Sequence, residues 1–125
     1  MHDLHLPAKF TPTHQTAGLP GFPAIDIFGP AGSYVTAPEE CRLVWPHLIP
    51  WDTRNKVGGW TCYLACDEGT PTEHWYFATH FSSLRDRGRY HKGGVLGILA
   101  AVPNGAWDTH IHEGQHKGPF EPPHT

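Results

Sequence analysis

The chain has 125 residues, a length that fits one domain with one hydrophobic core. Hydrophobic residues make up 38% and charged residues 17% of the chain, which excludes a disordered or highly charged protein. The formal net charge of -3 argues against a broad basic face. We therefore expect neither nucleic acid nor a membrane among the partners.

The sequence shows no signal for secretion or for crossing a membrane. No apolar run approaches the roughly 18 residues of a membrane span. The start, from Met1 to His5, lacks the basic and apolar blocks of a secretion signal. We therefore expect synthesis in the cytoplasm.

The chain is predicted to be mostly β, because its 14 glycines and 13 prolines favour turns and short strands over long helices. Residues 1–22 read as an extended arm that proline and glycine interrupt. The runs that read as strands are 24–28, 33–37, 41–45, 60–66, 74–81, 94–100 and 109–113. Residues 46–57 are predicted as an irregular loop, 82–92 as a helical turn or a polar loop, and 115–125 as a polar tail. This order predicts one small antiparallel β-sheet domain with long loops over residues 1–125.

The cysteines favour a reducing compartment and packing in the core. Cys41, Cys62 and Cys66 are odd in number, so at least one has no partner within the chain. Cys62 and Cys66 lie on one face of a predicted strand but too far apart to bridge each other. We interpret all three as small buried apolar residues, with a bridge from Cys41 to either of the others as the alternative.

The 11 histidines are the most informative feature, because imidazole is the commonest metal ligand and proton carrier near neutral pH. His110 and His112 flank one residue in a predicted strand, so both rings project from the same face. Such a pair forms half of a tetrahedral zinc site, or one ligand beside one proton carrier. The alternative is an exposed polar pair on an edge strand.

Two further residues have a structural and a functional interpretation. His80 ends an aromatic strand, where a partly buried, hydrogen-bonded histidine is common. Asp26 lies inside the apolar run 24–28, where a carboxylate costs free energy unless it is paired or binds a metal. A cap on the following turn is its structural alternative.

The order of these segments resembles the M23 family of zinc metallopeptidases, the lysostaphin-like peptidoglycan endopeptidases. The blocks that carry the resemblance are 23–37, 58–64, 76–84, 92–98 and 110–113, within roughly residues 14 to 114. The first resembles a motif in which a ligand aspartate precedes a turn and a strand, and the last a histidine pair followed by an acid. Each block is loose, but their colinear order is specific.

The resemblance implies a lysostaphin-like fold, a bound Zn²⁺ ion and hydrolysis of peptide bonds in bacterial peptidoglycan, as in a phage-type lysin. It implies that Asp26 and His112 are zinc ligands. His110 and His80 would lie beside the metal-bound water, one as general base and the other as stabiliser of the oxyanion.

One position departs from the family pattern. The family places its first ligand histidine four residues before the aspartate, and Phe22 occupies that position here. We predict that His14, the nearest upstream histidine, replaces it as the third ligand. The other candidates are His5, His47 and His91. If none does, the chain is a catalytically inactive relative that binds cell wall or serves as a structural phage component.

The tryptophans have two possible roles. Trp60 and Trp75 lie on predicted strands and are expected in the core. Trp45, Trp51 and Trp107 lie in or next to predicted loops, where they either pack locally or line a groove for a peptide or sugar.

Overall fold

The computed structural model describes residues 3–6 and 24–121, and this part of the chain is nearly all β. The strands are β1 (Asp3–His5), β2 (Ala24–Phe28), β3 (Tyr34–Thr36), β4 (Cys41–Asp52), β5 (Val57–Cys66), β6 (His74–Leu84), β7 (Gly88–Tyr90), β8 (Val95–Leu99) and β9 (His110–Lys117). A short 3₁₀ turn, Pro103–Gly105, precedes β9. The prediction of a small, mostly β domain is confirmed. None of the described residues form a helix with the length and hydrophobicity of a membrane span.

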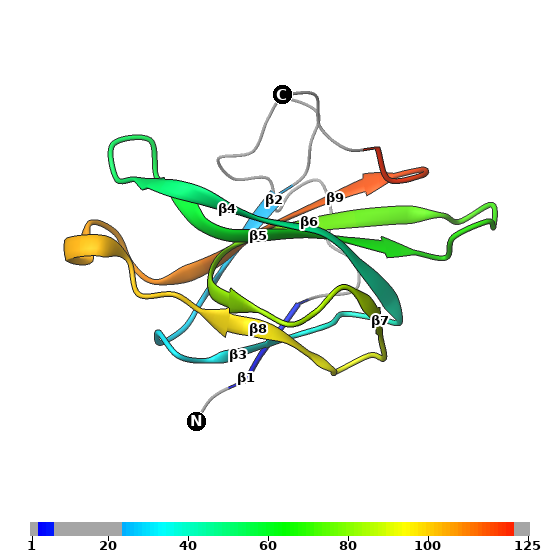
Figure 1. Ribbon diagram of the computed structural model, residues 1–125, viewed down its shortest axis with the longest axis horizontal. Coiled ribbons are helices and arrows are strands. Elements are labelled where there is room, and N and C mark those ends of the chain that lie inside the picture. Colours follow the sequence, from blue (N-terminus) through cyan, green and yellow to red (C-terminus); the bar gives the residue numbers. More distant parts are fainter. Residues whose placement is uncertain (1–2, 7–23, 122–125) are drawn as a thin grey trace.

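One sheet contains all nine strands, in the order β1-β3-β8-β6-β5-β4-β7, with β9 pairing to both β6 and β2. Every pair is antiparallel except β1 with β3. The strand β6 joins two parts of the sheet, because its first part pairs with β9 and its last part with β8. Figure 1 shows β1, β3 and β8 beneath the layer that contains β2, β9, β6, β5 and β4.

The main hydrophobic core lies between these two parts of the sheet. Its largest fully buried side chains include Tyr76, Phe81, Leu43, Leu64 and Leu96. The three cysteines are buried and free, which confirms the interpretation of Cys41, Cys62 and Cys66 as core residues.

The predicted loop over 46–57 is wrong, because β4 continues through Pro46 and Pro50 to Asp52. The register of β4 against β5 shifts between Val44 and His47 and again between Ile49 and Asp52. Each shift contains one of the two prolines, so neither proline occupies a regularly paired position. On its other side β4 pairs with β7 only through residues 41–43, so the rest is an edge among the described residues. A proline lacks the N–H that a central strand requires, but an edge tolerates it.

Two other boundaries differ from the prediction. Within 82–92 there is no helical turn, because β6 extends to Leu84 and β7 follows at Gly88–Tyr90. The strand β9 runs on to Lys117, into the predicted polar tail, since residues 115–117 pair with 74–76 of β6. Strand pairing uses backbone groups, so polar side chains at the end of a ladder do not stop it.

The side chain of Glu113, on β9, points to the core face of the sheet and is fully buried. Neither of its carboxyl oxygens has a hydrogen-bond partner among the described residues. Burial therefore raises the pKa of Glu113 well above its ordinary value of 4.5.

We predict that Glu113→Leu stabilises the metal-free protein by about 1 to 3 kcal/mol, because it removes an unpaired buried carboxyl. The folded state holds this proton at a pH where the unfolded chain has lost it. The contribution of Glu113 to wild-type stability therefore falls as pH rises above 4.5, and the gain from the variant grows. Urea unfolding with chelator at mildly acidic and mildly alkaline pH measures both effects. A destabilised variant would contradict the prediction.

Candidate metal centre

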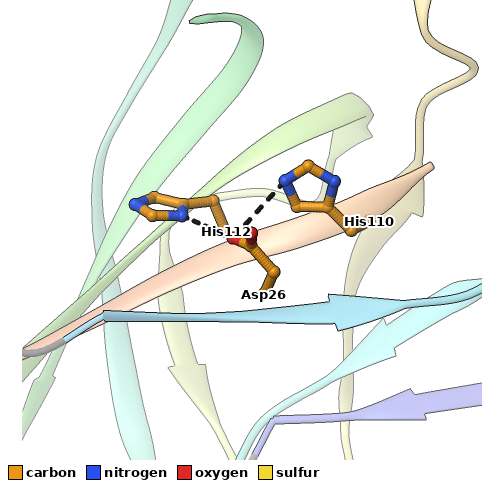
Figure 2. Close-up of side chains that lie close together, drawn as sticks. All are labelled: Asp26, His110 and His112. Atoms are coloured by element: carbon orange, nitrogen blue, oxygen red, sulfur yellow. Dashed lines mark hydrogen bonds and ion pairs between the residues drawn. The ribbon is translucent and has the colours of Figure 1, made fainter. Parts of the chain in front are cut away.

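The register of β2 against β9 brings a carboxylate and two imidazoles together. Asp26 pairs with His112, and Phe28 pairs with His110. Asp26 Oδ1 lies 2.7 Å from His112 Nδ1 and 3.4 Å from His110 Nε2 (Figure 2). The potential ligand atoms of the three residues all lie within 4.8 Å of one another, although residues 26 and 112 are far apart in the sequence.

The hydrogen bonds of His110 indicate that the cluster can bind a cation. His110 Nδ1 is 2.8 Å from the carbonyl oxygen of Asp108, which can only accept, so Nδ1 carries a hydrogen. In the neutral ring Nε2 is then a bare lone pair that faces the carboxylate oxygen of Asp26. Either a second proton or a metal ion must offset this contact. Imidazole nitrogen and carboxylate oxygen are donors that suit a metal of the zinc class.

His80 lies beside the cluster, with its ring 5.1 Å from that of His110 and 6.5 Å from that of His112. Its Nδ1 donates to the carbonyl oxygen of Gly58 over 2.8 Å, and its ring stacks on Trp51 at 5.7 Å. Burial is the largest cause that lowers the pKa of His80 to about 4; the nearby His110 and His112 also lower it, whereas the hydrogen bond to Gly58 and the charge of Asp26 oppose the shift. His80 is therefore neutral near pH 7, with its Nε2 free to accept a proton.

An irregularity in β6 directs His80 toward the cluster. The register of β6 against β5 shifts between Trp60 and Cys62, opposite this part of β6, and His80 has a positive φ of 81°. Simple alternation would place His80 with Tyr76 and Ala78, which face the core. The bulge turns the side chain to the other face, as bulges next to functional sites often do.

Two glycines of β5 make this arrangement possible. A Cβ at Gly58 would lie 2.5 Å from the Cα of Trp51, and one at Gly59 would lie 3.1 Å from the Cα of His80. Both glycines have positive φ. The chain thus passes close enough for Trp51 to cover His80 and for the Gly58 carbonyl to hold its ring.

A groove with a cavity volume of ≈ 840 Å³ opens over the cluster. Besides Asp26, His80, His110 and His112, its lining is rich in aromatic side chains: Phe28, Tyr63, Trp75, Phe77 and Trp107. The ring of Phe28 lies 5.2 Å from His110 and the ring of Phe77 lies 5.5 Å from His112. An open, mostly apolar groove with convergent polar groups at one place is typical of a ligand site.

The structure thus brings together Asp26, His80, His110 and His112 of the predicted site residues. His14 and Phe22 lie outside the described residues. The other histidines that we considered as third ligands are not in the cluster. His5 bonds to Thr36, His47 stacks on Tyr63, and His91 is exposed beside Glu40.

The tryptophans divide between the two expected roles. Trp60 packs against the main core, whereas Trp75 is buried on the groove side, in the smaller apolar cluster that also contains Val44 and Tyr63. Trp107 lines the groove and lies 6.0 Å from Trp51, whereas Trp45 packs on Tyr63 in a smaller apolar cluster.

Sequence reasoning missed the backbone and ring contacts that orient the histidines, namely the carbonyls of Gly58 and Asp108 and the ring of Trp51. The glycine pair before a predicted strand was the only signal for the first of them. Comparison of the chain with family models, with curated proteins and with solved structures finds no match.

We predict that Gly58→Ala disturbs the centre. Gly69→Ala is the matched control, because Gly69 also has positive φ but a Cβ there meets nothing within 4 Å. The control should cost about 1 kcal/mol of unfolding free energy from backbone strain. Gly58→Ala should cost about 1 to 3 kcal/mol more from overpacking against Trp51. Urea unfolding followed by tryptophan fluorescence measures both, and equal costs would contradict the close contact.

Proposed function

We propose that the protein is a zinc-dependent endopeptidase that hydrolyses peptide bonds of bacterial peptidoglycan. The observation that carries the proposal is the convergence of His110 and His112 on one oxygen of Asp26, with neutral His80 beside them in a groove. The colinear resemblance to the M23 peptidases supports the same reaction.

Asp26 and His112 are the residues that we propose to hold the ion. The third ligand is His14, as predicted, or His110, whose Nε2 already faces Asp26. A zinc ion bound here would lower the pKa of a bound water toward neutrality and polarise the scissile carbonyl.

The hydrogen bond to Gly58 determines which ring nitrogen of His80 can transfer protons. Since Nδ1 is committed to that carbonyl, Nε2 is the ring atom that exchanges protons with the substrate. Neutral His80 accepts a proton from the attacking water, and the protonated ring then donates it to the leaving amine. Because burial lowers the pKa of His80, the ring gives this proton up readily. His110, if it is not a ligand, carries a second proton on Nε2 and donates it in a hydrogen bond to the oxyanion.

The walls of the groove suit a peptide better than a sugar alone. Phe28 is 60% exposed at the groove, and Phe77 and Trp107 add apolar surface near the histidines. The lining includes one lysine, Lys56, and the acids Asp108 and Glu121. Aliphatic stems of cross-linking side chains would pack on the aromatic rings, while the charged groups orient the peptide ends.

We predict that the purified protein cuts isolated peptidoglycan, that a chelator stops the reaction and that added zinc restores it. Asp26→Ala should lose activity and one equivalent of zinc per chain, because it removes the carboxylate on which the cluster converges. Release of new amino groups and elemental mass spectrometry give the two readouts. His47→Ala, outside the cluster, is the control. Activity that persists after complete zinc removal would exclude the metallopeptidase.

We predict that His80→Ala keeps zinc but lowers kcat by roughly 10²- to 10⁴-fold, the usual contribution of a general base. His14→Ala and His110→Ala then distinguish the third ligand, since only replacement of the true ligand removes the same equivalent of zinc as Asp26→Ala. Full zinc binding without any cleavage would favour the alternative, an inactive relative that binds cell wall.

A further inference from the structure

A second group of metal-binding side chains lies on the opposite face of β6. Residues 75, 77 and 79 line the groove, whereas Tyr76 packs in the main core, and strand alternation places His74 on the same side as Tyr76. There, potential ligand atoms of Glu39, Cys66 and His74 lie within 4.8 Å of one another. Because the two groups face opposite sides of the sheet, this one does not depend on the proposed peptidase site.

Strand register builds this second group. Cys66 ends β5 and His74 begins β6, and the two are paired residues. Arg42 pairs with Ala65, so Cys41 is the next position along and lies across from Cys66 on the same face. Glu39 approaches from just before β4, close enough for its carboxylate to reach both His74 and Tyr76.

The contact between His74 and Glu39 is unfavourable if the His74 ring is neutral. Its Nδ1 is 2.7 Å from the carbonyl oxygen of Thr72, so Nδ1 carries the hydrogen. Its Nε2 is 2.9 Å from Glu39 Oε2, and that same oxygen accepts a hydrogen bond from Tyr76 over 2.6 Å. A neutral ring would place a lone pair against the carboxylate. A cation, or a second proton on the ring, must therefore offset this contact.

The donor set selects among cations. Cys66 and Cys41 are each 1% exposed, and the His74 and Glu39 side chains are 14% and 25% exposed. The thiols are thus shielded while one side of the group stays open for an ion to enter. Sulfur and imidazole donors beside one carboxylate suit zinc and related ions, whereas magnesium and calcium require oxygen donors.

We infer that Glu39, Cys66 and His74 form a second cation site, specific for a zinc-class ion. The ion would replace the thiol proton of Cys66 and link the segment before β4, the end of β5 and the start of β6. The Thr72 carbonyl acts as the outer partner that fixes the ring of His74.

Cobalt(II) distinguishes the two sites, because a thiolate ligand produces a sulfur-to-cobalt charge-transfer band in the near ultraviolet. The proposed peptidase site contains no sulfur donor, so this band reports only the second site. The chelator-treated wild-type chain, kept reduced with a phosphine, is titrated with cobalt. In the Asp26→Ala chain, which lacks the first site, we expect the band to saturate at one equivalent per chain and to disappear when zinc is added.

Variants test the ligands one by one. Cys66→Ser should abolish the band, and His74→Ala, which alters the open side of the group, should weaken cobalt binding by at least about tenfold. Cys62→Ala is the matched control, since this buried cysteine is outside the group and should keep the band. Asp26→Ala should also keep it, so that failure of the peptidase proposal is seen separately.

Absence of the band in folded wild-type protein at excess cobalt would overturn the inference, and the group would then be a protonated His74–Glu39 pair. A band that survives both Cys66→Ser and His74→Ala would overturn it as well. If Cys66→Ser does not fold, Glu39→Gln and His74→Ala decide by the same titration.

Discussion

The pairing of β2 with β9 is the constraint on which the candidate metal centre depends. It places Asp26 opposite His112 and Phe28 opposite His110, across most of the length of the chain. Without this pairing a carboxylate within an apolar strand would be expensive to bury. Because β9 also pairs with β6, the same strand determines where His80 lies relative to the other two histidines. One strand thus fixes the positions of groups that come from three parts of the sequence.

Alternation along β6 organises the molecule into two chemical faces. One face carries the aromatic groove and the histidine cluster, and the other carries the core and the Glu39–Cys66–His74 group. The alternation of side chains between the two faces is interrupted where the pairing of β6 with β9 ends and its pairing with β8 begins. His80 lies at that point. The positive φ of His80 is a local cost of this exchange, and the tight packing of Gly58, Gly59 and Trp51 holds it.

The sequence allowed the fold class and the same-face placement of His110 and His112 to be predicted, because both follow from strand periodicity. The anomalous Asp26 was also visible, since a lone acid in an apolar run requires an explanation. The orientation of His80 was not predictable, because a bulge reverses the alternation there. Nor was the adjacency of Cys66 and His74, which depends on the register of a hairpin. Pro46 and Pro50 led to the wrong prediction of a loop, because an edge strand such as β4 tolerates prolines that would disrupt a central strand.

The proline-containing edge of β4 has a consequence for solubility. Beyond residue 43 this strand has no neighbour on its outer side among the described residues, and Leu48 is 58% exposed there. An uninterrupted edge of this length would be a template for another copy of the chain. Pro46 and Pro50 each remove a donor, and the register shifts beside them bend the strand. Pro46 and Pro50, which made this strand resemble a loop in the sequence, thus also oppose edge-to-edge aggregation of the folded protein.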